Sequence, residues 1–168
     1  MKNFNTNTEN SPEWLTPPRI VEALGPFDLD PCACVDRPWD TAKIHYTKNE
    51  NGFDKPWEGR VWLNPPYGNE TFKWIKRLAD HGNGIALIFA RTETKGFFDQ
   101  VWDRADAIFF FKGRLKFYRP NGVQGGSANA PSCLIVYGRD NVLAVNNALK
   151  SKLIDGVLVT SWVRSFRG

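Results

Sequence analysis

The order of apolar and amphipathic segments is the feature of this sequence that most limits its fold. Residues 61–64 (VWLN) form a short apolar segment, residues 70–82 (ETFKWIKRLADHG) have the spacing of an amphipathic helix, and residues 84–90 (GIALIFA) are apolar throughout. A continuous apolar strand is typical of a parallel sheet that is covered on both faces. A strand, a helix and a strand in this order form a right-handed parallel crossover.

The same alternation continues towards the C-terminal end. We expect helices over residues 95–105 and 141–153, and strands over residues 106–111, 130–138 and 156–162. The predicted fold class is therefore α/β, with a doubly wound, mostly parallel sheet that binds ligands at the carboxyl ends of its strands.

The N-terminal part has weaker signals. Residues 16–25 (TPPRIVEALG) predict a short helix, with Thr16 as its cap and Gly25 as its stop. Residues 27–30 predict a short strand, and residues 31–57 predict a long ordered loop with little regular structure.

Length and composition set broader limits. The 168 residues suit one compact domain, expected over residues 13–168 after a polar lead-in over residues 1–12. Lys and Arg outnumber Asp and Glu by 22 to 18, which suits an anionic partner such as nucleic acid but also many ordinary enzymes. No stretch has the roughly 20 apolar residues of a membrane span, and no signal peptide is evident, so we expect a cytoplasmic protein without a membrane partner. Cys32, Cys34 and Cys133 lack the spacing of a zinc site, so no metal site is predicted.

A rigid turn follows the first of the two central strands. Asn64 comes at the predicted carboxyl end of that strand, and Pro65, Pro66 and Tyr67 follow it. Each proline fixes its own φ and restricts the residue before it, so the turn is stiff and presents carbonyl acceptors without N–H donors at the prolines. The alternative interpretation is a turn whose prolines only begin the next helix.

This array suits one kind of chemistry in particular. An amine conjugated to an aromatic ring is a poor nucleophile, because its lone pair is delocalised. Two acceptors bonded to its two protons favour a pyramidal nitrogen and stabilise the positive charge that develops on it during methyl transfer. The proton can leave afterwards, and a neighbouring aromatic ring can stack on a base that has flipped out of a duplex.

Several segments together resemble a known family. EWLTPPRIVEALGPFDLDPCA, FDKPWEGRVWLNPPYG, ARTETKGFF and FKGRLKF, in this order, are similar to segments of the small phage-type DNA N-6-adenine methyltransferases of the Dam group. The resemblance runs over residues 14–137. It implies a minimal Rossmann-like methyltransferase without a separate target-recognition domain, encoded by a phage or prophage and acting in the bacterial host cell.

The resemblance also implies reactants and site residues. The cofactor would be S-adenosylmethionine and the partner double-stranded DNA. Asn64 and the Pro65 carbonyl would bind the adenine amino group, Pro66 would complete the rigid turn, and Tyr67 would stack on the flipped base. Other reactions that fit the same acceptors are methylation of cytosine N4, RNA adenine or protein glutamine. A protein of another class that fits is a DNA-binding module that keeps the fold and has lost turnover.

The expected cofactor site combines the resemblance with physical reasoning. A carboxylate at a strand end, Asp28 or Asp30, can bind the ammonium group of the cofactor, although either can also cap a loop. Residues 30–38 (DPCACVDRP) lack the usual glycine-rich turn, and Glu50 and Asp54 are candidates for the ribose and the adenine region. The expected cofactor-binding residues are Trp14, Thr16, Pro17, Asp28, Asp30, Pro31, Cys32, Ala33 and Asn64, and the alternative for the first three is an ordinary helix start.

Basic side chains supply candidate DNA contacts. Lys112, Arg114 and Lys116 would share one face of a strand over residues 111–117, which suits phosphate but also an edge strand protected by its charges. Arg91 follows another apolar strand and should face the same cleft as Tyr67, for substrate positioning or for helix capping.

Overall fold

A seven-stranded sheet forms the centre of the protein. The computed structural model describes residues 13–164, so the predicted lead-in over residues 1–12 lies outside the described residues. The strand order is β2-β1-β3-β4-β8-β5-β9. The strands of this sheet are β1 (Leu29–Asp30), β2 (Ile44–His45), β3 (Val61–Leu63), β4 (Gly84–Phe89), β5 (Ala107–Phe111), β8 (Ser132–Tyr137) and β9 (Gly156–Val159).

Most of these strands run in one direction. β1 pairs in parallel with β2 and β3, and β3 pairs in parallel with β4. β8 is antiparallel to both β4 and β5, so β5 points the same way as β4, and β9 is antiparallel to β5. The prediction of a mixed α/β fold with a mostly parallel sheet is confirmed, and the arrangement is compatible with a Rossmann-like fold.

Two apolar cores lie on opposite faces of the sheet. Along β4, Ile85 and Leu87 pack with one core, whereas Ala86 and Ile88 pack with the other, as expected because successive side chains of a strand point to opposite faces. Helices α1 (Pro18–Leu24) and α4 (Arg139–Lys150) contribute to the first core. Helices α2 (Thr71–His81) and α3 (Lys95–Phe97), with the π-helical turn η2 (Phe98–Trp102), contribute to the second.

The strand order indicates where a ligand is expected. β2 lies on one side of β1 and β3 on the other, so the order of the strands changes direction at β1. In open α/β sheets, ligands bind outside the carboxyl ends of the strands at such a reversal. The loops after β1, β2 and β3 therefore meet at the edge of the sheet where a site is expected.

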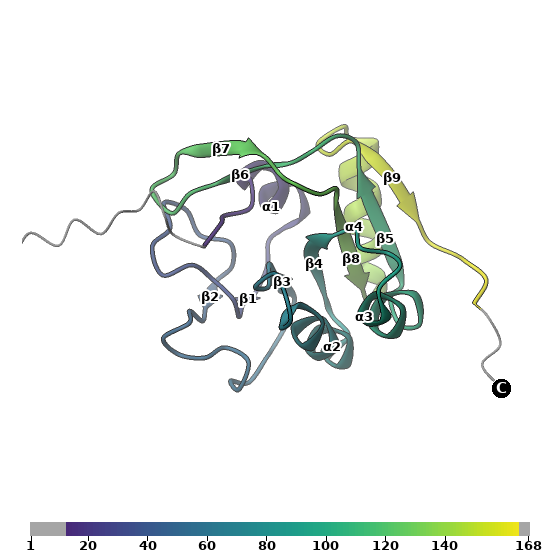
Figure 1. Cartoon of the computed structure of the whole chain (residues 1–168), viewed down its shortest axis with the longest axis horizontal. Coiled ribbons are helices and arrows are strands. Elements are labelled where there is room, and N and C mark those ends of the chain that lie inside the picture. The colour runs from purple at the N-terminus through teal and green to yellow at the C-terminus, as the bar shows by residue number, and fades with distance from the viewer. Residues whose placement is uncertain (1–12, 165–168) are drawn as a thin grey trace, which may run out of the picture.

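A separate hairpin crosses this edge. It consists of β6 (Lys116–Tyr118) and β7 (Gln124–Ser127), and in Figure 1 it runs over the top of the molecule towards the side that carries β1 and β2. Leu15 holds it through two backbone hydrogen bonds with Tyr118, of 2.7 and 2.9 Å. Gly125 allows the close approach of Trp14, because a Cβ at this position would lie 2.7 Å from the indole ring.

Three local predictions were wrong. Helix α1 begins at Pro18 with Pro17 as its N-cap and no side-chain cap bond, so Thr16 does not cap it. The predicted loop over residues 31–57 does have little regular structure, and its one strand is β2, which is two residues long and too short to show an alternating pattern.

The two other corrections concern longer elements. The predicted helix over residues 95–105 is divided into α3 and η2. The predicted strand over residues 111–117 is interrupted, because β5 ends at Phe111 and β6 begins at Lys116.

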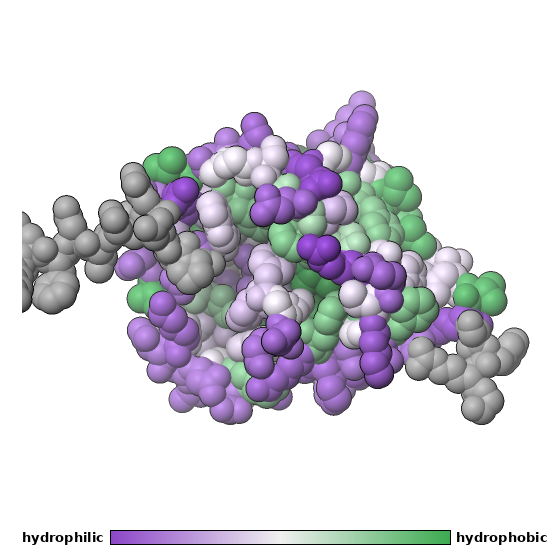
Figure 2. Space-filling view, viewed as in Figure 1, coloured by the Kyte–Doolittle hydropathy of each residue, from purple (hydrophilic) through white to green (hydrophobic). Residues whose placement is uncertain are grey.

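Figure 2 shows the hydropathy of one face of the molecule. Figure 2 shows polar residues around most of this face and hydrophobic residues gathered over the β5 and β9 end of the sheet, where Val157 is 62% exposed. In the part of the chain that the structure describes, no helix combines the length and the apolar character needed to cross a membrane.

A buried asparagine ties strand ends together at the edge opposite the crevice. Asn141 of α4 is fully buried, and its Nδ2 donates to Asn83 Oδ1 at 2.9 Å and to the Tyr137 carbonyl at 2.8 Å. Its Oδ1 accepts a hydrogen bond from Arg60 Nε. Asn83 directly precedes β4, Arg60 directly precedes β3, and Tyr137 is the last residue of β8.

We expect Asn141→Ala to lower the free energy of unfolding by about 2–4 kcal/mol, because it removes the hydrogen bonds of a fully buried side chain to three segments and leaves the carbonyl of buried Tyr137 without this donor. Urea unfolding measures this change. The matched control is Asn147→Ala on the exposed face of the same helix, expected to change stability by less than about 0.5 kcal/mol. Equal effects of the two substitutions would contradict the structural role of Asn141.

Candidate active site

The rigid turn lies where the sequence predicts it, directly after β3. The Asn64 Nδ2 donates to the carbonyl oxygen of Trp14 at 3.1 Å, and the Tyr67 hydroxyl lies 3.4 Å from Asn64 Oδ1. The hydroxyl of Thr71, the first residue of α2, donates to the Pro66 carbonyl at 2.7 Å. The turn is therefore held at both ends, by the segment before α1 and by the start of α2.

The Tyr67 ring has a defined orientation. It stacks on Phe89 at the end of β4, with ring centroids 4.5 Å apart and an angle of 10° between the planes. Tyr67 is still 38% exposed, so the stack covers only part of the ring. Burial at its hydroxyl end raises the pKa of Tyr67, so this group stays protonated. The result is a neutral, partly open aromatic surface beside Asn64.

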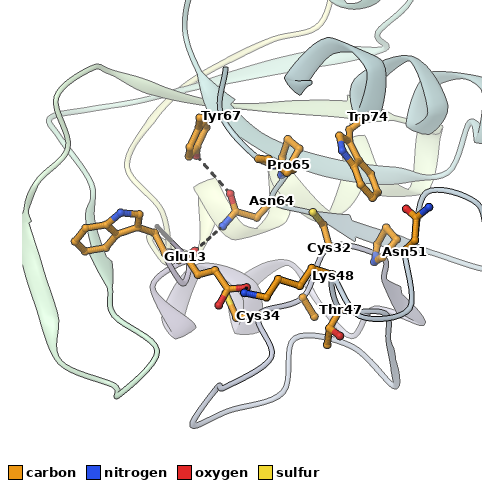
Figure 3. A pocket seen from close by; sticks show the side chains of 15 residues that line it. Glu13, Cys32, Cys34, Thr47, Lys48, Asn51, Asn64, Pro65, Tyr67 and Trp74 are labelled. Atoms are coloured by element: carbon orange, nitrogen blue, oxygen red, sulfur yellow. Dashed lines mark hydrogen bonds and ion pairs between the residues drawn. The ribbon is translucent and has the colours of Figure 1, made fainter. Parts of the chain in front are cut away.

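A cavity of about 510 Å³ opens next to this turn (Figure 3). Eight residues expected from the sequence line it: Trp14, Pro31, Cys32, Ala33, Asn64, Pro65, Pro66 and Tyr67. Its volume falls within the range of about 300–1,000 Å³ typical of small-molecule sites.

Sequence reasoning missed the other half of the wall. The additional lining residues are Glu13, Cys34, Thr47, Lys48, Asn51, Gly52 and Trp74. Residues 47–52 follow β2, whose carboxyl end lies beside that of β1 because the two strands are parallel. The only signal that could have identified this segment was the strand itself, which is two residues long.

One glycine explains how this second segment reaches the site. A Cβ at Gly52 would lie 2.0 Å from the Pro31 carbonyl oxygen, so only glycine lets the loop after β2 pass against the loop after β1. The backbone N–H of Ala33 also donates to the Tyr46 carbonyl at 2.9 Å. Residues 30–38 contain no glycine. The close backbone approach that a glycine-rich turn would allow is provided by Gly52, in the loop after β2.

The two predicted acids of β1 do not line the cavity. Asp28 precedes the strand, accepts a hydrogen bond from the Arg60 N–H at 2.8 Å and forms an ion pair with Lys43 at 3.4 Å. The hydrogen bond from Arg60 lowers the pKa of Asp28. Asp30 is buried, and its carboxylate accepts from the Cys32 N–H at 3.0 Å and from the Thr41 hydroxyl. Asp30 therefore shapes the loop after β1.

Other expected residues also lie away from the cavity wall. Thr16 and Pro17 do not line it, and neither do Glu50 and Asp54. The Glu50 carboxylate instead accepts hydrogen bonds from the N–H and hydroxyl of Thr47, which stabilises the turn after β2.

The cysteines do not form a reactive or metal-binding group. Burial raises the pKa of Cys32 above its ordinary range and that of Cys34 to about 12, so both remain thiols at neutral pH. No cluster of three metal-binding side chains occurs within residues 13–164.

A second cavity, of about 460 Å³, shares Tyr67 with the first. Its lining residues are Tyr67, Gly68, Thr71, Phe72, Phe89, Arg91 and Thr94. The ends of the adjacent strands β3 and β4 thus bring Arg91 to the same cavity as Tyr67. A cation beside an aromatic surface suits an anionic ligand with a planar ring.

The three remaining basic candidates line neither cavity. Lys112 forms an ion pair with Asp155 at 3.9 Å, and Arg114 Nη1 donates to the Ala128 carbonyl at 3.2 Å. Lys116 is exposed on β6. These residues lie in β6 or in the segment between β5 and β6, outside the two cavities.

The comparisons with known proteins identify one family. The family model described as DNA N-6-adenine-methyltransferase (Dam) matches residues 3–151, which include every residue that lines the two cavities. No curated protein and no solved structure matches the chain. The resemblance found in the sequence is confirmed by the family match.

The structural role of Asp30 leads to a prediction on pH and stability. Burial raises the pKa of Asp30 from 3.8 to about 6 in the folded protein. The folded state therefore holds this proton more tightly than the unfolded state, and the associated stability is lost as pH rises from about 4 to about 6. Relative to Asp30→Asn, which cannot ionise, the wild type should lose up to about 3 kcal/mol across this interval. Urea unfolding at a series of pH values measures the difference, and a constant difference would contradict the role of Asp30.

Proposed function

The chain belongs to the Dam family of DNA N-6-adenine-methyltransferases, and on that premise we propose that it transfers a methyl group from S-adenosylmethionine to the exocyclic amino group of adenine in double-stranded DNA. The observation that carries this proposal is the orientation of Asn64. Its side-chain amide nitrogen donates a hydrogen bond to the Trp14 carbonyl, so its oxygen is directed away from that carbonyl and can accept a hydrogen bond from a substrate amine.

The residues of the larger cavity fit the cofactor. Its wall offers aromatic and small apolar side chains together with one carboxylate, one ammonium and two amides, which suits a molecule with a planar base and a charged end. Trp14, the loop residues 31–34 and Asn64 would hold it. When bound, S-adenosylmethionine supplies an electrophilic methyl group on a positively charged sulfur.

The protein's contribution to the reaction is positioning and electrostatics. Asn64 Oδ1 and the Pro65 carbonyl would accept hydrogen bonds from the two N–H groups of the target amine and stabilise the positive charge that develops on its nitrogen. After transfer of the methyl group, the same two acceptors would hold the methylated ammonium, which would then release a proton to water. The 3.4 Å contact of Asn64 Oδ1 with the Tyr67 hydroxyl is long for a hydrogen bond, which leaves this oxygen available to the substrate.

Tyr67 and the basic residues would bind the DNA. Phe89 supports the Tyr67 ring, so a flipped adenine would stack on the remaining open surface of that ring. Arg91 would contact the substrate from the second cavity, and Arg114, Lys116 and Lys112 would contact phosphates from the hairpin side. We further infer that the described residues form one domain with a doubly wound sheet.

The decisive substitution is Asn64→Ala. We expect the rate of labelled methyl transfer to DNA to fall at least roughly 100-fold, because the variant loses a preorganised acceptor. The measurement is transfer of labelled methyl from S-adenosylmethionine to unmethylated DNA, followed by identification of the methylated nucleoside. Asn147→Ala serves as the control for a remote asparagine. Label in N4-methylcytosine, in RNA or in protein would assign the chemistry to another amine, and no label on any substrate would indicate a binding module without turnover.

The stacking role of Tyr67 gives a second test. Tyr67→Ala should raise the KM for DNA roughly 10- to 100-fold, because base stacking on an aromatic ring contributes about 1–3 kcal/mol. Tyr67→Phe keeps the ring and the contact with Phe89, so its KM should stay within a few-fold of the wild type. Steady-state kinetics with a fixed DNA duplex measures both. Equal losses in the two variants would assign the effect to the hydroxyl group instead.

A further inference from the structure

An ion pair forms part of the wall of the larger cavity. Glu13 Oε1 lies 3.7 Å from Lys48 Nζ, although Glu13 precedes α1 and Lys48 follows β2. The Glu13 side chain is 23% exposed and the Lys48 side chain 68% exposed. Figure 3 shows their charged ends directed towards each other, beside Cys34 and below Asn64. The pair therefore has one partner within the wall and one at the opening to solvent.

These two groups are the only charged side chains among the described residues that line this cavity. The acids of β1 cannot replace Glu13, because Asp30 is buried with its carboxylate bonded to the loop and Asp28 pairs with Lys43 outside the cavity. A ligand with both a positive and a negative group would therefore find its complementary charges at this one place.

We propose that Glu13 and Lys48 form the receptor for the α-amino acid end of the cofactor, with the Glu13 carboxylate binding its ammonium group and Lys48 binding its carboxylate. This inference rests on the proposed function. An α-amino acid carries its two opposite charges on the same carbon atom, so both can reach an adjacent acid and base together. In this arrangement the ammonium group of the cofactor is bound by Glu13, and not by Asp28 or Asp30.

The position of the pair agrees with the proposed reaction. Glu13 is the neighbour of Trp14, whose carbonyl accepts the hydrogen bond from Asn64. The amino acid end of the cofactor would thus lie close to the residue that binds the target amine. Asn51 and Trp74 line the same cavity and appear on the other side of Asn64 and Pro65 from Glu13 in Figure 3, where an adenine ring would fit.

Because Lys48 is largely exposed, its contact with Glu13 can be replaced by contacts with a ligand. An ion pair at this distance with one largely exposed partner contributes little stability by itself, so new charge-assisted hydrogen bonds to a ligand can replace or extend it at low cost. A purely structural pair, which only joins the segment before α1 to the loop after β2, would instead affect the binding of every ligand of the cavity equally. This difference makes the two roles separable by experiment.

Calorimetry with three ligands tests the proposal. S-adenosylmethionine carries both charged groups, decarboxylated S-adenosylmethionine carries only the ammonium, and 5′-methylthioadenosine carries neither. We expect Glu13→Gln to weaken binding of the first two ligands by roughly 10-fold or more. Lys48→Met should weaken only S-adenosylmethionine, by about 5- to 10-fold because this lysine is largely exposed. Neither variant should change the affinity for 5′-methylthioadenosine, which also reports that the variant is folded.

Matched controls come from another Glu–Lys pair. Glu70 and Lys73 lie 3.4 Å apart on the surface at the start of α2, outside the lining of the cavity. Glu70→Gln and Lys73→Met should leave all three affinities unchanged. Tight binding of S-adenosylmethionine by the wild type together with unchanged or equally weakened binding of all three ligands by the variants would overturn the proposed receptor alone. Failure of the wild type to bind any of the three would overturn the proposed function as well.

Discussion

The parallel pairing of β3 with β1 on one side and with β4 on the other is the constraint on which the site depends. Parallel strands place their carboxyl ends at one edge of a sheet, so the loops that follow them meet there whatever their separation in sequence. The Asn64 turn, the loop over residues 31–34 and the segment over residues 47–52 come together for this reason. The hairpin of β6 and β7 then covers the same edge through its backbone bonds with Leu15.

Burial distinguishes two acidic residues, Asp30, whose carboxylate has a structural role, and Glu13, whose side chain lines the cavity. Asp30 lies at the end of β1, where a ligand-binding acid is expected, yet its buried carboxylate is bonded to its own loop and its pKa rises to about 6. Glu13 lies at the cavity, in a segment without regular secondary structure. A charged group that must exchange partners with a ligand needs access to solvent, because desolvation of an unpaired charge is costly. The structure places Glu13, and not Asp30, in such a position.

The elements that could be predicted from the sequence are those that are stabilised by burial of a regular apolar pattern. Strands such as β4 and β8 are buried on both faces, so their continuous apolar sequence was readable, and α2 showed a clear amphipathic pattern. β2 and the division of residues 95–105 into α3 and η2 were not readable, because tertiary contacts rather than local periodicity set them. The same applies to Thr16, which has the side chain of a capping residue but lies buried before a helix that begins at Pro18.

The sequence by itself determined the fold class, the rigid Asn64–Tyr67 turn and the family, because these depend on local periodicity, on proline geometry and on adjacent residues. Only the tertiary structure decided which residues join that turn. Lys48 and Gly52 belong to one loop and lie tens of residues after Glu13 in the chain, and they meet Glu13 because the sheet brings the loop after β2 against the segment before α1. Charge pairing and close backbone approach are properties of positions in space, and no pattern along the chain encodes them.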